Sequence, residues 1–417
     1  QLSKISSSGS NLMSSELFNG LETCPDDPIL QLMALAREDD NPLKVDLSAG
    51  VYKDEQSLTP VMRCVKEAEE RRLKKEQTKT YQGLAGDLRF DKFVSSLALG
   101  DEHPAIAEGR VSTIQTTGGS GAIRAAAELF KRIKNGCNVW VSNPTWANHI
   151  PLLSSAGNQI HTYPYYNHGE SGVRFAEMIE QLSSAEAGDV LLLQGGCHNP
   201  CGEDLSLDQW QRLTDLILEK GLLPFVDVAY HGLADDLETD AQGWRYMAAK
   251  VPEMLISYSG SKSFSLYRDR VGALMAISPD KATAEKVLTN LMTISRVLYS
   301  MPPAHGAYLV AEILDDAELR AKWVSELAEI QSRIQTVRIR FADALQEKLG
   351  SDRFEFIRHQ KGMFSFLGIS AEQVRQMRST HSVYMLDSSR MNIAGLTSSN
   401  LDHVAAAVAS VIEPSAG

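Results

Sequence analysis

Short apolar runs alternate with amphipathic stretches from about residue 60 to about residue 329. This alternation is typical of strands joined by crossover helices in a mostly parallel sheet. The runs are nearly continuous in Val, Ile and Leu, as expected where helices cover both faces of a strand. The sequence therefore indicates an α/β fold. The predicted strands span residues 111–115, 139–142, 190–193, 222–228, 254–258 and 271–277.

Helix signals accompany these runs. Ser206 and Gln209 have the spacing of a capping box, and Gly221 supplies a helix end just before the next strand. Residues 27–39 predict another helix, with Pro28 in its first turn, which we expect to pack on a smaller domain. A long amphipathic helix begins after residue 318. Its apolar face consists of Leu319, Trp323, Leu327, Ile330, Ile334, Val337 and Phe341.

The alternation of strands and helices ends where this long helix begins, and this change predicts a division of the chain into domains. Residues 1–12 are Ser-rich and are interpreted as a tag or disordered tail, which makes Met13 the expected native start. Residues 13–59 are expected to form an N-terminal arm and part of a small domain. Residues 60–329 would then form a large ligand-binding domain, and residues 330–417 a small C-terminal α/β domain.

Charge and cysteine content exclude several kinds of partner. Lys and Arg number 41 against 53 Asp and Glu, and the resulting net charge of -12 repels nucleic acid and anionic membranes. No apolar run is long enough to span a bilayer. The five cysteines are scattered and odd in number, which favours reduced thiols in a cytoplasmic protein over a disulfide framework.

Lys262 stands between two predicted strands, where α/β sheets bind ligands. A lysine in a loop is usually a solvated surface charge. Here Ser259, Ser261 and Arg270 lie close in sequence and could together hold a phosphate while the lysine amine forms a Schiff base. The segment therefore predicts a site for a phosphorylated carbonyl compound.

Asp227 lies inside the apolar run at residues 222–228. A buried carboxylate needs a partner, so Asp227 is expected to face a cation or a protonated ring nitrogen. The alternative is a helix cap or a structural ion pair. Tyr230 follows three residues later and could bring a phenol near the same ring.

Two further turns follow predicted strands. Residues 116–121, Thr-Thr-Gly-Gly-Ser-Gly, open an amphipathic helix and could bind an anion through backbone N–H groups, although they match neither a dinucleotide fingerprint nor a P-loop. Residues 197–201, Cys-His-Asn-Pro-Cys, make a poor zinc site because no second cysteine pair accompanies them, so no metal is expected. Asn199 is more suited to binding a ligand oxygen.

Together these stretches resemble the class I aminotransferases of fold type I, specifically the aspartate and aromatic amino-acid subgroup. The resemblance extends from Glu16 to Ile412. It rests on residues 50–54, 81–83, 118–121, 142–149, 198–200, 227–230, 259–272, 299–306 and 389–392. It implies a large domain with a mostly parallel seven-stranded sheet between helices, and a smaller α/β domain.

The resemblance also implies pyridoxal 5′-phosphate (PLP) as cofactor. Lys262 would form the Schiff base and shuttle the substrate proton, Asp227 would hold the pyridine nitrogen protonated, and Tyr230 would donate to the ring oxygen. The large domain would thus be the PLP-binding domain. The remaining cofactor contacts would come from Gly119, Ser120, Trp146, Asn199, Ser259, Arg270 and, from a second subunit, Tyr81.

For the substrate, the resemblance implies binding by Gly50, Trp146, Asn199 and Arg390, with Arg390 pairing with the α-carboxylate. Arg296 from the second subunit would meet a side-chain carboxylate. The expected partners are amino acids, 2-oxo acids and a second copy of the chain in a homodimer with shared active sites. The expected reaction is ping-pong transamination of L-aromatic amino acids, L-aspartate or both with 2-oxoglutarate.

Several positions depart from the common family pattern and leave the substrate open. Cys201, Gln194 and Met301 differ from the usual residues, while Val51, Lys53 and Thr59 are similar to aspartate-selective members. Ser120 and residues 264–267 are similar to aromatic-accepting members. A strict aspartate aminotransferase is therefore an alternative. A β-lyase or decarboxylase is disfavoured by the paired arginines, and a non-catalytic protein by the presence of Lys262 and Asp227.

Overall fold

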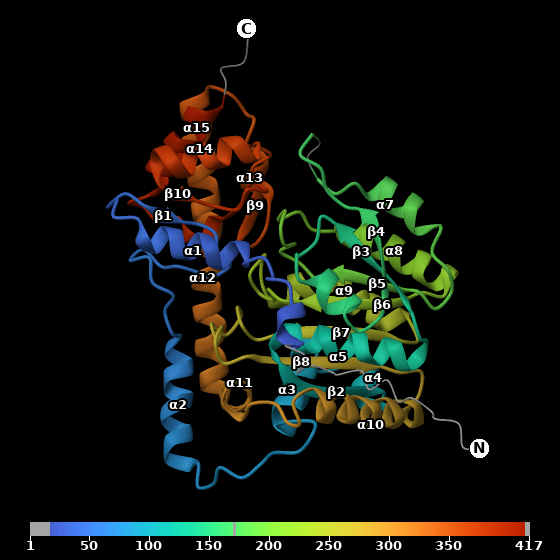
Figure 1. Ribbon diagram of the computed structural model, residues 1–417. Coiled ribbons are helices and arrows are strands. Elements are labelled where there is room, and N and C mark those ends of the chain that lie inside the picture. Colours follow the sequence, from blue (N-terminus) through green and yellow to red (C-terminus); the bar gives the residue numbers. More distant parts are fainter. Residues whose placement is uncertain (1–16, 170–171, 413–417) are drawn as a thin grey trace, which may run out of the picture.

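The computed structural model describes residues 17–169 and 172–412, so the tail expected at residues 1–12 lies outside it. Its centre is a seven-stranded sheet in the order β2-β8-β7-β6-β5-β3-β4 (Figure 1). The strands are β2 (Val111–Thr117), β3 (Asn138–Asn143), β4 (Gln159–Pro164), β5 (Val190–Gln194), β6 (Leu223–Val228), β7 (Met254–Ser259) and β8 (Val271–Ile277). Strand β8 is antiparallel to both neighbours and the other pairs are parallel. The predicted α/β class and mostly parallel sheet are confirmed.

Six strands match the predicted runs to within two residues at each end. Strand β4 was not predicted. It forms one edge of the sheet, where it pairs with β3, and its sequence Gln-Ile-His-Thr-Tyr-Pro has only one fully buried position. An edge strand with few buried side chains lacks the continuous apolar run that identified the others.

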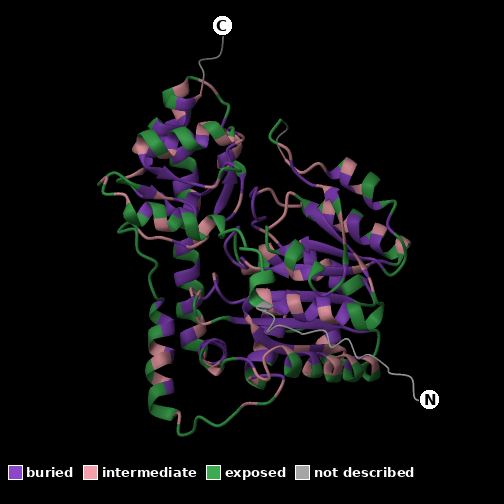
Figure 2. Cartoon of the chain, viewed as in Figure 1, coloured by how far each residue is buried: buried purple, intermediate pink, exposed green. Residues whose placement is uncertain are grey.

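Helices cover both faces of the sheet. The helices α5 (Gly118–Ile133), α6 (His149–Ser154) and α10 (Lys281–Leu298) share one core with Leu192 and Phe225. The other face carries α3 (Leu88–Leu99), α7 (Phe175–Leu182), α8 (Leu207–Lys220), α9 (Leu237–Lys250) and α11 (Ala304–Asp315), whose core includes Leu191 and Val226. Successive strand residues enter opposite cores, which explains the continuous apolar runs and the buried sheet in Figure 2. The short helix α4 (Pro104–Ala107) precedes β2.

A separate core lies in the C-terminal part. It is built from residues of β1 (Val45–Asp46), α13 (Phe356–His359), α14 (Ala371–His381), β10 (Val383–Tyr384), β11 (Arg390–Asn392), η2 (Ile393–Gly395) and α15 (Leu401–Val411). Strand β1 pairs with β10 in parallel, and β11 pairs with β9 (Phe364–Phe366) antiparallel. The N-terminal η1 (Leu17–Gly20) precedes α1 (Pro28–Glu38), which contacts this part through Leu32 and Tyr384.

The predicted helix signals are confirmed. Ser206 and Gln209 form both bonds of a capping box at the start of α8, and Gly221 ends the helix in the left-handed conformation. The long helix is α12 (Ala317–Leu349), which runs from beside the sheet into the C-terminal part (Figure 1). Its Trp323 belongs to the core of the sheet and its Phe341 to the C-terminal core. The helix α2 (Arg63–Lys75) packs against α11 and α12. None of the helices within residues 17–169 and 172–412 is long and apolar enough to cross a membrane.

Candidate active site

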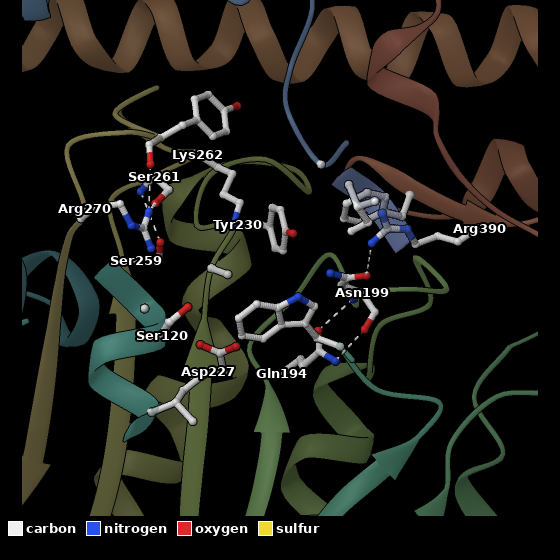
Figure 3. A pocket seen from close by; sticks show the side chains of 18 residues that line it. Ser120, Gln194, Asn199, Asp227, Tyr230, Ser259, Ser261, Lys262, Arg270 and Arg390 are labelled. Atoms are coloured by element: carbon white, nitrogen blue, oxygen red, sulfur yellow. Dashed lines mark hydrogen bonds between the residues drawn. The ribbon is translucent and has the colours of Figure 1, made fainter. Parts of the chain in front are cut away.

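A cavity of about 240 Å³ opens at the carboxyl ends of β5, β6 and β7, facing the C-terminal part (Figure 3). This is the position at which open α/β sheets bind ligands. The fold brings together most of the predicted site residues here. Those lining the cavity are Gly50, Gly119, Ser120, Trp146, Asn199, Asp227, Tyr230, Ser259, Lys262, Arg270 and Arg390.

Lys262 follows β7 and its side chain enters this cavity rather than projecting into solvent (Figure 3). Its Nζ lies 4.8 Å from the centre of the Tyr230 ring. Burial lowers the pKa of Lys262 to about 8, with Arg270 acting in the same direction and Asp227 opposing the shift. An amine with this pKa is unprotonated in about one molecule in ten at pH 7 and in about half of the molecules at pH 8, and only the unprotonated amine attacks a carbonyl group.

Asp227 lies near the end of β6 and is 7 % exposed. One carboxylate oxygen accepts a hydrogen bond from the Ser257 hydroxyl at 2.7 Å, and the other lies 3.0 Å from His149 Nε2. The carboxylate thus has structural partners, as the alternative interpretation required, and it also lines the cavity. Thr145 Oγ1 lies 2.7 Å from His149 Nδ1 and orients that ring.

An anion-binding cradle lies beside Lys262. The first turn of α5 has no side-chain cap, so its N–H groups are free to meet an anion. Arg270 donates to Ser261 Oγ at 3.3 Å and to the Tyr267 carbonyl at 2.8 Å. A side chain at Gly118, where φ is +71°, would come within 2.5 Å of Arg270 Nη2. The glycine therefore lets the guanidinium reach the helix terminus.

Arg390 forms the opposite wall of the cavity. The residue is 5 % exposed, and burial lowers the pKa of its guanidinium while Tyr230 opposes that shift. Its Nη1 donates to Asn199 Oδ1 at 3.3 Å and its Nη2 to the Ser48 carbonyl at 2.6 Å. Within the described residues, no carboxylate pairs with it and its buried Nε has no hydrogen-bond partner. A buried guanidinium in this state has the chemistry to pair with a carboxylate.

The remaining cavity walls are largely aromatic. Burial raises the pKa of the Tyr230 phenol, with Arg390 opposing, so the phenol keeps its proton and can donate a hydrogen bond. Trp146 packs its edge against His149 with ring centres 5.2 Å apart. A side chain at Gly50 would come within 2.7 Å of the Phe364 ring, so this glycine allows the close approach of the two segments.

Tyr81 and Arg296 are the two predicted site residues that do not line this cavity. Tyr81 is 89 % exposed. Arg296 is exposed in the last turn of α10, where it donates to the Ser300 hydroxyl at 2.8 Å. Both had been assigned to the cavity of a second subunit, and that assignment stays a prediction.

Four further residues also line the cavity. Gln194, which the family resemblance places behind the cofactor ring, is one of them. Tyr267, Ile29 and Phe364 also line it, although no site role is expected for them from the sequence. Ile29 and Phe364 come from segments far apart in sequence, and no local pattern identifies them.

Cys197 and Cys201 are both buried free thiols. Cys201 Sγ lies 3.2 Å from His198 Nδ1. The part of the chain that the structure describes contains no group of three or more His, Cys, Asp or Glu residues able to hold a metal ion.

Comparisons with known proteins agree with this geometry. Residues 42–408 match the family profile described as aminotransferase class I and II. The chain is 43% identical over 396 residues to an aspartate aminotransferase of Escherichia coli K12, covering 95% of this chain and 100% of that protein. It is 42% identical to an aromatic-amino-acid aminotransferase of Paracoccus denitrificans, covering 92% and 97%. The crystal structure of an aromatic-amino-acid aminotransferase from Burkholderia pseudomallei, covalently bound to pyridoxal phosphate, superposes with a TM-score of 0.93 at 39% identity, covering 95% of this chain and 100% of that one.

Proposed function

This chain belongs to the class I and II aminotransferases, and we propose that it transfers the amino group of L-aromatic amino acids, L-aspartate or both to 2-oxoglutarate. The observation that carries the proposal is one cavity in which a buried lysine of lowered pKa lies between a cradle of hydrogen-bond donors and a buried arginine that has no carboxylate partner among the described residues. The relatives named for aspartate and for aromatic amino acids match this chain almost equally well, at 43% and 42% identity. Both donor classes therefore remain in the proposal.

The enzyme is PLP-dependent, and the residues of the cavity fit this cofactor. When bound, PLP supplies an electron sink for the charge left as the substrate loses its Cα proton. We propose that Gly119, Ser120, Ser259 and Arg270 hold the phosphate. Their backbone N–H groups, hydroxyls and guanidinium are the donors that a phosphate requires.

The other residues of the cavity fit the ring of the cofactor. We propose that Asp227 holds the pyridine nitrogen protonated, since this carboxylate is oriented by Ser257 and His149. Tyr230 and Asn199 donate to the ring oxygen, and Trp146 stacks on the ring. Lys262 would hold the cofactor covalently, and its amine, when free, would move the proton at Cα.

Arg390 then binds the α-carboxylate of the substrate, with Asn199, Trp146 and the backbone at Gly50 beside it. Arg390 has donors left over for this purpose because it bonds only Asn199 and Ser48 within the described chain. Arg390 and the phosphate cradle lie on opposite sides of the cavity, with Lys262 between them, an arrangement that would place Cα of the substrate near Lys262 (Figure 3).

We further propose a homodimer in which Tyr81 reaches the phosphate and Arg296 reaches a substrate side-chain carboxylate in the site of the second copy. The exposure of both residues supports this arrangement. Mixing Lys262→Ala subunits with Arg296→Ala subunits tests it. A hybrid has one site with both Lys262 and Arg296, so activity on aspartate should return upon mixing, and no return would contradict shared sites.

The domain division is also a proposal: residues 13–59 and 330–417 form the small domain with the arm, and residues 60–329 form the PLP-binding domain. Two separate cores support it, and both include residues of α12. Limited proteolysis with and without substrate would test it. We propose a cytoplasmic location, supported by the free thiols among the described residues.

The visible absorption spectrum of the purified enzyme tests the function. L-aspartate and L-phenylalanine are added in separate cuvettes, and conversion of the bound cofactor to its aminated form is followed. Conversion by both donors supports the broad specificity. Conversion by aspartate alone identifies a strict aspartate aminotransferase, and no cofactor band after addition of PLP contradicts the proposal.

A further inference from the structure

Gln194 ends β5 on the wall of the cavity, and its neighbour across the sheet is Asp227 (Figure 3). Its side chain makes three hydrogen bonds. Gln194 Oε1 accepts from the Asn199 N–H at 2.8 Å, and Gln194 Nε2 donates to the Asn199 carbonyl at 3.0 Å. Nε2 also lies 3.1 Å from His198 Nε2. Both Nε2 hydrogens and one lone pair of Oε1 are therefore engaged by two residues of the adjacent turn.

The two bonds to Asn199 account for the whole main-chain hydrogen bonding of that residue among the described residues. The preceding N–H groups have a different anchor, because Cys197 and His198 donate to Asp204 at 2.8 and 2.9 Å. The turn thus has two anchors, and Gln194 is the one that holds Asn199.

The two Asn199 bonds fix the orientation of the Gln194 amide, and that orientation places the amide nitrogen beside His198. Burial lowers the pKa of His198 to about 3, with His149 acting in the same direction, so its ring is neutral. Because an amide nitrogen only donates, His198 Nε2 must accept from Gln194 and its hydrogen must be on Nδ1, facing Cys201 Sγ at 3.2 Å.

The side chain of Asn199 lines the cavity, and its amide has a defined orientation there. Its Oδ1 accepts from Arg390 Nη1 at 3.3 Å, which directs the two Nδ2 hydrogens to other acceptors. No acceptor for them is found within residues 17–169 and 172–412. They are available to a ligand.

We infer that Gln194 is a positioning residue: by clamping the Asn199 peptide it places the Asn199 amide between the cofactor and Arg390. The inference rests on the proposed function, which assigns Asn199 to the cofactor oxygen and Arg390 to the substrate carboxylate. Loss of the clamp lets the amide move away from both. Gln194 would then affect cofactor electronics and carboxylate binding without touching the reacting atoms.

The test compares Gln194→Leu and Gln194→Glu with wild-type enzyme loaded with PLP. Gln194→Glu is nearly isosteric and keeps an acceptor for the Asn199 N–H, but it places a second oxygen against the Asn199 carbonyl. Ser142→Ala is the matched control, because Ser142 Oγ also lies 3.0 Å from His198 Nε2 and does not touch Asn199. The readouts are the pH midpoint of the cofactor's visible absorption and the affinities for succinate and 3-phenylpropionate, carboxylates without an amino group.

Both Gln194 variants should show a shifted absorption midpoint and about tenfold weaker binding of the carboxylates. Ser142→Ala should stay within about twofold of wild type, the scatter expected where no positioning bond is lost. In an Asn199→Ala background, Gln194→Leu should cause no further loss, because both changes act through one group. Thermal unfolding shows whether each variant is folded. If Gln194→Leu is not folded, the nearly isosteric Gln194→Glu variant tests the inference.

An unchanged midpoint and unchanged carboxylate affinity in a folded Gln194→Glu enzyme would overturn the inference. So would a further tenfold loss in the Asn199→Ala background. Failure of the wild-type enzyme to bind PLP or to transaminate would instead overturn the proposed function, so the two failures are distinguishable.

Discussion

Lys262 Nζ lies 4.8 Å from the centre of the Tyr230 ring, inside the cavity that Asp227 and Arg270 also line. The amine is thus held over an aromatic face, with a carboxylate favouring its charged form and a guanidinium favouring its neutral form. Burial has the largest effect on the pKa of this amine, and the two charged neighbours shift the pKa further in opposite directions.

Under the proposed function, replacing Lys262 by Ala would remove both the covalent attachment of PLP and the group that moves the Cα proton. We expect turnover to fall by at least about 10²–10⁴-fold, the range for loss of a general acid–base. PLP should still bind noncovalently because the phosphate cradle and Asp227 are intact. Spectra and single-turnover rates measure both effects, and normal turnover in this variant would refute the role of Lys262.

The pKa of about 8 predicts how fast Lys262 of the apoenzyme is alkylated by formaldehyde and a borane reductant. Only the unprotonated amine reacts, so labelling should rise with pH through a midpoint near 8. Asp227→Asn removes the charge that raises the pKa and should lower this midpoint, whereas Arg270→Met should raise it. Mass spectrometry measures the labelling of Lys262, with exposed lysines of the same chain as the internal control. If Asp227→Asn and Arg270→Met shifted the Lys262 midpoint in the same direction, the proposed effects of the two charges would be refuted.

Most of the fold could be predicted because its strands are buried on both faces. Continuous apolar runs identified six strands, whereas β4 lies at the sheet edge and lacks such a run. The lysine, the aspartate and the glycine turn were predictable for a related reason. Each directly follows or ends a strand, and the ends of parallel strands meet at one edge.

The partners of Asp227 could not be predicted from local patterns. Ser257 lies opposite Asp227 in the register of β6 and β7, and His149 is 78 residues away in sequence. Both contacts depend on strand register and helix placement, which apolar periodicity does not specify. The same holds for the bonds that link Gln194 to Asn199, since they require the turn after β5 to fold back on the strand.

Arg296 should discriminate between substrates if it meets a side-chain carboxylate. Arg296→Ala is expected to lower kcat/KM for L-aspartate by about 10²-fold or more, the cost of leaving a charged partner unpaired, with a much smaller loss for L-phenylalanine. Arg390→Ala is the control, because an α-carboxylate site should lower both equally. Equal losses in Arg296→Ala would refute its role.

Asp91 on α3 predicts a dependence of stability on pH. Its carboxyl is 6 % exposed and neither oxygen has a hydrogen-bond partner in the part of the chain that the structure describes. Burial raises its pKa from 3.8 to about 9, and Asp87 adds to the shift. At a pH below 3.8 the Asp91 carboxyl is protonated in both the folded and the unfolded chain. Between the two values the unfolded chain loses its proton while the folded carboxyl keeps it, so the folded state loses stability as pH rises.

Asp91→Leu should therefore stabilise the protein at pH 8 by at least about 1–3 kcal/mol, the usual cost of a buried unsatisfied polar group, to which the cost of keeping the carboxyl protonated at this pH adds. The gain should be smaller at pH 5. Urea unfolding of the apoenzyme at both pH values measures the difference. Asp101→Leu, at an exposed position just beyond α3, is the matched control and should show no such dependence. A gain that is the same at both pH values would mean that Asp91 is ionised in the folded protein, since only a carboxyl kept protonated by burial couples folding to proton uptake in this range.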